Sequence, residues 1–358
     1  MNSERNLPDD SAGSPASAKE EKKKAKKAKS GRARRFLTKT IFYGLILYAL
    51  VAVGLGVYWS WQPEPFDVGN NALERVGGDP AKLAPGATTV AAIAEVATTL
   101  LDKPGGYLSN DLMPPGLLMD NMPSWESGVL KEVRDSARAL RNDFSRSQSQ
   151  SIENKDLRAA DSSFNFTADS WALPATESQY REGIEALRQY LDALVTQRDR
   201  LARFYTRADN LVAYMVVVEK RLGSFAQRLS ASVGDAELTA ALVPQQEATD
   251  QADALRVKTP WNEIDDVFYE ARGYCWALLH IFRALAEDFD DVLSDKNAEF
   301  TVQQVIRDLE EATVRMWSPL VLNGSGFGFV NNHSLVLASY MSRANAAVID
   351  LRVLLQQG

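Results

Sequence analysis

The longest hydrophobic stretch of the chain lies near its N-terminus. Residues 40–61 (TIFYGLILYALVAVGLGVYWSW) form a run of 22 positions without a charge. At about 1.5 Å rise per residue this run makes a helix of ~33 Å, enough to cross a hydrocarbon core of about 30 Å. Aromatic residues stand at both ends, where their rings settle at the headgroup level. The pattern predicts one membrane-spanning helix, which we place at residues 36–62.

A cleaved signal peptide is the alternative interpretation of this stretch. The hydrophobic part of a signal peptide has about 7 to 15 residues and ends at small residues that form the cleavage site. This run is longer and closes on Tyr58, Trp59, Ser60 and Trp61. The sequence therefore favours an anchor that stays in the membrane.

Beyond the span, apolar residues recur at the spacing of helices. Residues 63–88 are rich in Pro, Gly and Asn and read as a linker. The segments with helical periodicity are 89–103, 125–146, 176–232, 260–292, 301–316 and 334–356. Because no alternating run of strand length stands between them, we expect a mostly α fold. The predicted architecture is an elongated antiparallel helical bundle over residues 89–358.

The longest periodic segment contains a heptad repeat. From Ile184 to Leu229, twelve of fourteen a and d positions are apolar or aromatic, the exceptions being Arg198 and Glu219. Such a seam is typical of packed helices and predicts one helix over 176–232. At about 1.5 Å per residue that helix is ~85 Å long, so the bundle is expected to be a rod unless the helix breaks near residues 206–210.

Three polar positions predict where helices begin. Ser124 is placed as the N-cap of the helix over 125–146. Thr176 with Gln179, and Thr301 with Gln304, have the spacing of capping boxes.

Charge is distributed unevenly between the two sides of the span. Residues 1–39 carry 12 Lys/Arg against 5 Asp/Glu, and the remainder carries 28 against 42. The positive-inside rule keeps the basic flank in the cytoplasm and exports the residues beyond the span. We therefore expect residues 1–35 to be a disordered basic cytoplasmic tail, and the domain over 89–358 to be periplasmic.

The basic tail and the acidic body restrict the partners. The lysine-rich run over 19–35 either sets the topology or also binds anionic lipid. The acidic body argues against nucleic acid as a partner, since neutralising phosphates needs clustered Lys and Arg on the folded part. The expected partners are the lipid bilayer and proteins of the cell envelope, and the oligomeric state stays open.

Few residues are suited to bind a metal. A single cysteine, Cys275, lies on an apolar face, which is typical of a buried thiol. His280 and His333 are far apart in the sequence and have no ligand-like spacing. We expect neither a metal site nor a cofactor.

Three stretches together carry a family resemblance. They are residues 103–130 (KPGGYLSNDLMPPGLLMDNMPSWESGVL), the SRSQSQS run at 145–151, and residues 323–355 (NGSGFGFVNNHSLVLASYMSRANAAVIDLRVLL). They resemble an uncharacterised domain family of Gram-negative bacteria whose members have one N-terminal membrane helix. The resemblance implies a bacterial inner-membrane location with a periplasmic domain, and it implies no activity.

Candidate catalytic groups are present but isolated. The Gly-rich stretch 323–328 lacks the strand-turn-helix context of a nucleotide site. Ser334 beside His333 lacks a third triad member. Acidic pairs at 265–266, 287–288 and 290–291 are a possible pair of catalytic carboxylates, although charges on amphipathic helices are usually solvated.

The hypothesis that we favour is a membrane-tethered periplasmic interaction or scaffold protein, not an enzyme. The alternative is a cell-envelope hydrolase that uses paired carboxylates, which a buried carboxylate pair in a cleft would support. Two loops, 107–123 and 322–333, combine Gly or Pro with large apolar residues. We expect them to form a recognition surface or to plug the bundle ends; the candidate residues are Tyr107, Leu117, Met119, Phe327 and Phe329.

Overall fold

The structure is a computed structural model that describes residues 15–147, 152–231, 259–318, 320–324 and 330–357. The chain divides into two compact units, residues 1–55 and residues 56–358. Within the described ranges there is no strand, and one isolated antiparallel bridge joins Asn323 and Asn332. The predicted mostly α fold with one apolar N-terminal helix is confirmed.

The first unit consists of helix α1 (Pro15–Trp59) up to residue 55. Its portion Phe36–Trp59 is long and apolar enough to cross a membrane. Large apolar side chains such as Leu47 are exposed along it, as lipid contact requires. Residues 15–35, assigned to a disordered tail by composition, are helical instead, since runs of Lys, Glu and Ala have high helix propensity. Residues 1–14 lie outside the described ranges.

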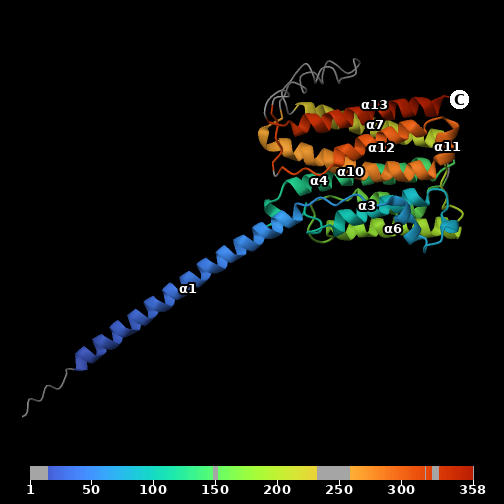
Figure 1. Cartoon of the computed structure of the whole chain (residues 1–358). Coiled ribbons are helices and arrows are strands. Elements are labelled where there is room, and N and C mark those ends of the chain that lie inside the picture. The colour runs from blue at the N-terminus through green and yellow to red at the C-terminus, as the bar shows by residue number, and fades with distance from the viewer. Residues whose placement is uncertain (1–14, 148–151, 232–258, 319, 325–329, 358) are drawn as a thin grey trace, which may run out of the picture. The chain divides into compact units, whose positions relative to one another are not determined.

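The second unit is a bundle of helices, several of which lie side by side in layers (Figure 1). Its helices are α2 (Val68–Arg75), α3 (Ala87–Asp102), α4 (Asn121–Ala139), α5 (Lys155–Phe164), α6 (Thr176–Thr196), α7 (Ala208–Ala231), α10 (Ile264–Asp288), α11 (Asp290–Asp295), α12 (Glu299–Thr313) and α13 (His333–Gln356).

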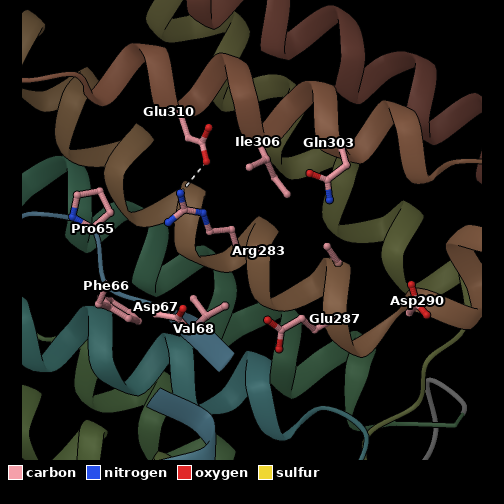
Figure 2. Close-up of a pocket in the computed structure, with 11 residues that line it drawn as sticks. Pro65, Phe66, Asp67, Val68, Arg283, Glu287, Asp290, Gln303, Ile306 and Glu310 are labelled. Atoms are coloured by element: carbon pink, nitrogen blue, oxygen red, sulfur yellow. Dashed lines mark hydrogen bonds and ion pairs between the residues drawn. The ribbon is translucent and has the colours of Figure 1, made fainter. Parts of the chain in front are cut away.

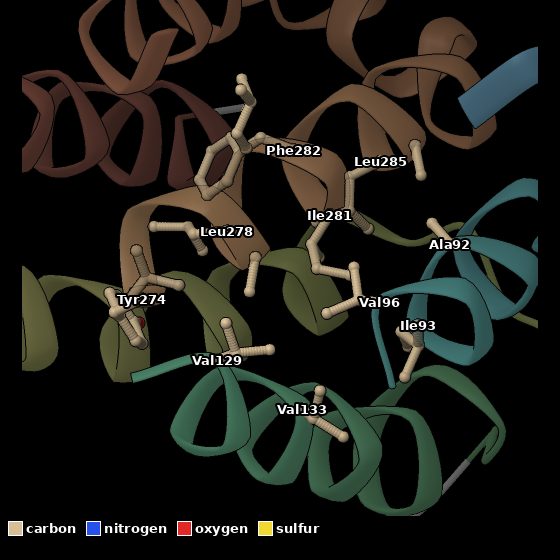
Figure 3. Close-up of a cluster of buried hydrophobic side chains, with 14 of the residues drawn as sticks. Ala92, Ile93, Val96, Val129, Val133, Tyr274, Leu278, Ile281, Phe282 and Leu285 are labelled. Atoms are coloured by element: carbon tan, nitrogen blue, oxygen red, sulfur yellow. The ribbon is translucent and has the colours of Figure 1, made fainter. Parts of the chain in front are cut away.

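Helix α10 forms the centre of this bundle. It packs against α4, α12 and α3, while α13 packs on α7 and α12, and α6 on α5 and α3. Most of its residues from Val267 to Leu285 are buried on every side, which is the pattern of a central helix. Figure 3 shows its apolar side chains meeting those of α3 and α4, among them Leu278, Val96 and Val129.

Two glycines let α4 and α10 approach each other closely. A Cβ built on Gly128 would overlap the carbonyl oxygen of Glu270, and a Cβ on Gly273 would overlap the carbonyl oxygen of Trp125. Both obstacles are backbone atoms, which cannot rotate away. Neither position has room for a side chain while this helix pair stays in place.

The single helix predicted over 176–232 is wrong. Helix α6 ends where Gln197 adopts a left-handed conformation with φ 52°, and α7 begins at Ala208. Between them Phe204 lies in the core, with its ring centre 5.3 Å from that of Phe144 and 5.7 Å from that of Phe289. The heptad misled because two of its positions in the break, Leu201 and Tyr205, are apolar or aromatic without belonging to a helix.

The stretch predicted as a linker, residues 63–88, differs from that expectation. It contains α2, whose N-terminus is capped by the Asp67 carboxylate at 2.8 Å from the Asn70 amide. Val68 and Ala72 are buried in the core. We call residues 62–67, which connect the end of α1 to α2, the strap.

The predicted N-caps are shifted from those in the structure. Asp120 caps α4, and the hydroxyl of Ser124 instead donates to Asp266 at 2.8 Å. Thr176 is the first residue of α6, with its hydroxyl donating to the carbonyl of Thr167 at 2.9 Å. Helix α12 begins two residues before Thr301. For Ser124 the hydroxyl is taken by a residue 142 positions later in the chain, a contact that local spacing does not reveal.

Candidate functional site

A groove of about 830 Å³ opens between α10, α12 and the strap (Figure 2). Its lining comes from residues 65–68 and, more than 200 positions later, from α10, α11 and α12. Its lining residues are Pro65, Phe66, Asp67, Val68, Arg283, Ala286, Glu287, Asp290, Gln303, Ile306 and Glu310.

Helical spacing brings the polar lining residues to one face of each helix. Arg283 and Glu287 are one turn apart on α10. Gln303, Ile306 and Glu310 occur at intervals of three and four on α12. Residues at these spacings project from the same side of a helix, so the two faces confront each other across the groove.

The groove carries an excess of negative charge. Arg283, which supplies the guanidinium of the lining, donates to Glu310 at 2.6 Å. Among the described residues of the groove, no second cation faces the carboxylates of Asp67, Glu287 and Asp290. Such a surface favours a positively charged ligand.

Asp288 and Glu287 are neighbours in the sequence but have different roles. Asp288 accepts from the amides of Gly86 at 2.9 Å and Thr89 at 2.7 Å, so it caps the start of α3. Glu287 points to the groove, where partial burial, and then the charges of Asp288 and Asp67, raise the pKa of its carboxyl. Burial is the larger cause of this shift, and the two neighbouring carboxylates add to it.

The strap forms one wall of the groove and is held by a buried histidine. The Phe66 amide donates to Nε2 of His280 at 3.0 Å, and the two rings stack with centres 4.0 Å apart. Nδ1 of His280 lies 2.7 Å from the Trp276 carbonyl and donates to it. Burial lowers the pKa of His280 to about 3, so the imidazole stays neutral and can accept from the strap.

A second contact fixes the beginning of the strap. The buried guanidinium of Arg272 donates to Oε1 of Gln62 at 3.1 Å. The same group donates to the carbonyls of Thr313 and Val314 at the end of α12, at 3.1 and 3.0 Å. The strap, α10 and the end of α12 are thereby joined at one side chain.

A polar cluster inside the bundle lies away from the groove. Glu132 on α4 is fully buried, and its carboxylate accepts from Ser136 at 2.5 Å and from Tyr214 of α7. Desolvation raises its pKa to about 7 despite these bonds. Tyr274 of α10 and Asp135 of α4 are the other titratable groups facing it. Because the cluster is enclosed by three helices, it is part of the core.

Tyr107, predicted in the recognition loop, is buried at 4% exposure. Its hydroxyl donates to the Ala168 carbonyl at 2.9 Å, and its ring packs edge-on against Tyr180. The loop is fixed by a buried ion pair between Lys103 and Glu126, whose carboxylate also accepts from the Leu108 amide at 2.8 Å. Tyr107 therefore plugs the bundle.

The other candidate residues divide into three cases. Leu117 is 58% exposed, whereas Met119 is partly buried against the core. Phe327 and Phe329 lie outside the described residues. Among the described members of this set, Leu117 is the one with a mostly exposed side chain.

The predicted catalytic groups are not assembled into one centre. Asp266 accepts from Ser124 at 2.8 Å, and Asp290 and Asp291 stand in the first turn of α11. Nδ1 of His333 accepts from the Leu322 amide at 3.0 Å instead of from Ser334. Among the described residues, no group of three or more His, Cys, Asp or Glu side chains is placed to hold a metal ion.

Sequence reasoning missed the groove itself. Its helical residues are charged positions on amphipathic helices, which resemble ordinary solvated faces. The useful signal is that His280 stands within the apolar stretch 273–282 of α10, where a polar ring needs a partner. That partner is the strap, 214 residues earlier in the chain.

Comparison with known proteins gives a family. A family model described as an uncharacterized protein conserved in bacteria (DUF2333) matches residues 32–358. The search of curated proteins and the search of solved structures each found no match.

Proposed function

Because this chain belongs to that family of uncharacterised bacterial proteins, we propose its function from its own geometry: a membrane-anchored interaction protein of the cell envelope. In this proposal α1 crosses the inner membrane with its basic end in the cytoplasm, and the bundle is periplasmic. The apolar length of Phe36–Trp59 and the basic charge before it support this placement.

The observation that carries the proposal is that the groove is built on the end of the anchor. The strap follows α1 after Ser60 and Trp61 and is fixed to α10 by His280 and Arg272. A partner bound in the groove is therefore held close to the membrane. Such tethering is the task of an adaptor.

The charge of the groove indicates the chemistry of the partner. With Arg283 paired to Glu310, the carboxylates of Asp67, Glu287 and Asp290 favour a segment that presents Lys or Arg. The role proposed is binding and not catalysis, since two members of the acidic pairs have structural partners: Asp288 caps the start of α3, and Asp266 accepts from the Ser124 hydroxyl.

Site-specific photo-crosslinking in cells tests this function. A photoreactive residue at Gln303, exposed in the groove, is expected to give a discrete adduct with an envelope protein at a Lys- or Arg-rich segment. Gln189 is a matched control, because it is also an exposed glutamine within a helix, on α6. The adduct should disappear in Glu287→Lys, which reverses a groove charge.

Two results would count against the groove as the binding site. One is an equal set of adducts from Gln303 and Gln189. The other is a Gln303 adduct whose yield is unchanged in Glu287→Lys.

A further inference from the structure

Exposed apolar side chains gather on the loop that contacts the end of α1. The loop over 112–118 exposes Leu112, Met113, Leu117 and Leu118, the last at 76%. A Cβ built on Gly56, in the last turns of α1, would lie 3.6 Å from Cβ of Pro115 in this loop. Four large apolar side chains thus stand in water beside the residues that end the candidate span.

Two further segments extend this apolar surface around the same point. Asn110 donates to the Ser170 carbonyl at 2.8 Å, which brings the segment 171–173 next to the first loop. Leu173 in that segment is 99% exposed. On the other flank, the Arg315 guanidinium lies 5.1 Å from the ring centre of Trp61 and 4.7 Å from that of Trp317, which is 84% exposed.

These three segments, residues 112–118, 171–173 and 314–318, form what we call the apolar rim. The first and third segments contact residues 56–61, and the second is linked to the first through the Asn110–Ser170 hydrogen bond. Residues 56–59 are the end of the candidate span. Gly105, with φ +89°, leaves room for the Trp59 ring at the same place, because a Cβ there would lie 2.7 Å from that ring. Segments of the rim therefore lie against residues 56–61, in which the candidate span ends.

We propose that the apolar rim binds the phospholipid surface of the membrane that α1 crosses. The inference rests on the membrane anchor of the proposed function. Patches of exposed Leu, Met and Trp mark interaction sites, and tryptophans settle at the headgroup level of a bilayer. Arg315 between two indoles suits the same level, since its guanidinium can bind lipid phosphates while the rings contact acyl chains.

The position of the rim decides between a bilayer and other occupants. Residues that contact the last turns of a membrane-spanning helix meet the bilayer surface without any further association step. A protein partner on the rim would have to displace lipid from around the span. Binding of the rim to lipid gives the bundle a second attachment to the membrane, in addition to the span of α1.

Spin labels in the full chain, reconstituted in vesicles of phosphatidylcholine and phosphatidylglycerol in equal parts, test the proposal. Cysteines are introduced one at a time at Leu118, Leu173 and Val314 of the rim. The native thiol does not interfere, because Cys275 is buried and burial raises its pKa to about 12. Phe300→Cys is the control, an exposed apolar position at the opposite end of α12.

The labels at the rim are expected to be more accessible to oxygen and less accessible to a polar nickel chelate than the label at Phe300. This pattern marks a site in the lipid interface. A water-like ratio at all three rim positions, equal to that at Phe300, would overturn the proposal. Dipolar broadening between labels at Val314 would also overturn it, since a second copy would then occupy the rim.

A further label separates this inference from the proposed anchor. Leu47→Cys lies within the candidate span and should be the most oxygen-accessible site of all. If Leu47 is in lipid while the rim stays in water, the rim proposal fails and the anchor stands. If Leu47 is in water as well, both fail.

Discussion

At the scale of single residues, Glu132 is the carboxyl group whose surroundings have the clearest consequence. It is fully buried and its pKa is raised to about 7, mainly by desolvation. The raised pKa means that folding favours the protonated form. The stabilising contribution of that proton is complete below the unfolded pKa of about 4.5 and is lost as the pH rises through 7.

We predict that Glu132→Gln removes this part of the pH dependence. The amide mimics the protonated carboxyl and still accepts from Ser136 and Tyr214. Relative to the native chain, the variant should gain about 3 kcal/mol in free energy of unfolding between pH 4.5 and pH 8. Urea unfolding across this range measures the difference. Glu182→Gln, on the exposed face of α6, is the control and should match the native profile.

The loop over 107–123 allows a second prediction, because its residues divide by burial. Tyr107→Ala empties a buried aromatic site and should lower the free energy of unfolding by about 3 to 5 kcal/mol. Leu117→Ala changes an exposed side chain and should stay within about 0.5 kcal/mol of the native value. Thermal unfolding of both variants checks this, and equal shifts for the two would contradict it.

The burial of these residues could not be predicted from the sequence. Glu132 stands on an amphipathic helix, where a carboxylate usually faces water, and only the arrangement of α7 and α10 around α4 encloses it. Tyr107 and Leu117 lie in the same Pro- and Gly-rich loop, so the local composition does not distinguish the buried residue from the exposed one. Tyr107 differs from Leu117 in that it contacts Ala168, a residue far away in the sequence.

At the scale of elements, the contact of α4 with α10 depends on the two glycines that face it. We predict that Gly128→Ala forces the helices apart, because the new methyl group would meet the backbone of Glu270. The loss of stability should be about 3 kcal/mol or more. Urea unfolding measures it.

Gly223→Ala on α7 is the matched control for this prediction. There a Cβ would meet only the side-chain amide of Asn345, at 3.6 Å. Higher helix propensity should then raise stability by about 0.5 to 1 kcal/mol. If Gly128→Ala behaved in the same way, the close approach of α4 and α10 would be refuted.

The strap provides another prediction about an element. His280→Ala removes the acceptor of the Phe66 amide and the ring on which Phe66 stacks. Brief digestion of the full chain with proteinase K should then cut residues 62–67 faster than in the native chain, because local opening exposes them. His333→Ala is the control, since it removes an imidazole that accepts the Leu322 amide in a different loop.

Faster cleavage caused by local opening of the strap must be distinguished from faster cleavage caused by unfolding of the whole domain. Urea unfolding of His280→Ala gives the contribution of global opening to the cleavage rate. Strap cleavage that rises no more than this contribution would show that His280 does not hold the strap.

Helices could be predicted where a local hydrophobic periodicity specifies them. They could not be predicted where contacts with residues far away in the sequence determine where a helix ends. The periodicity located the helices near 89–103, 260–292 and 334–356, since each presents an apolar face over several turns. It missed the break after α6, because the pocket that takes Phe204 is built by Phe144 and Phe289, which come from other parts of the chain. The groove was not predicted for the same reason, because its lining comes from distant parts of the chain.

At the scale of the whole molecule, the uneven charge predicts topology. We expect the N-terminus in the cytoplasm and the C-terminus outside it, since the basic residues precede the span. A reporter that is active only in the periplasm, fused after Gly358, should be active, and a cytoplasmic reporter at the same point should be silent. The reverse pattern would refute the proposed placement.

The strap also has a consequence for how the protein is made. Its partners Arg272 and His280 lie 210 and 214 residues further along the chain. At a synthesis rate of about 5 to 20 residues per second, the ribosome needs roughly 10 to 40 s to produce them after the strap. During that interval the nascent chain has α1 and the strap but lacks the walls of the groove that α10 and α12 form, and a chain released before α10 never completes the groove. Under the proposed function, a partner that binds the groove can therefore distinguish full-length copies from truncated ones.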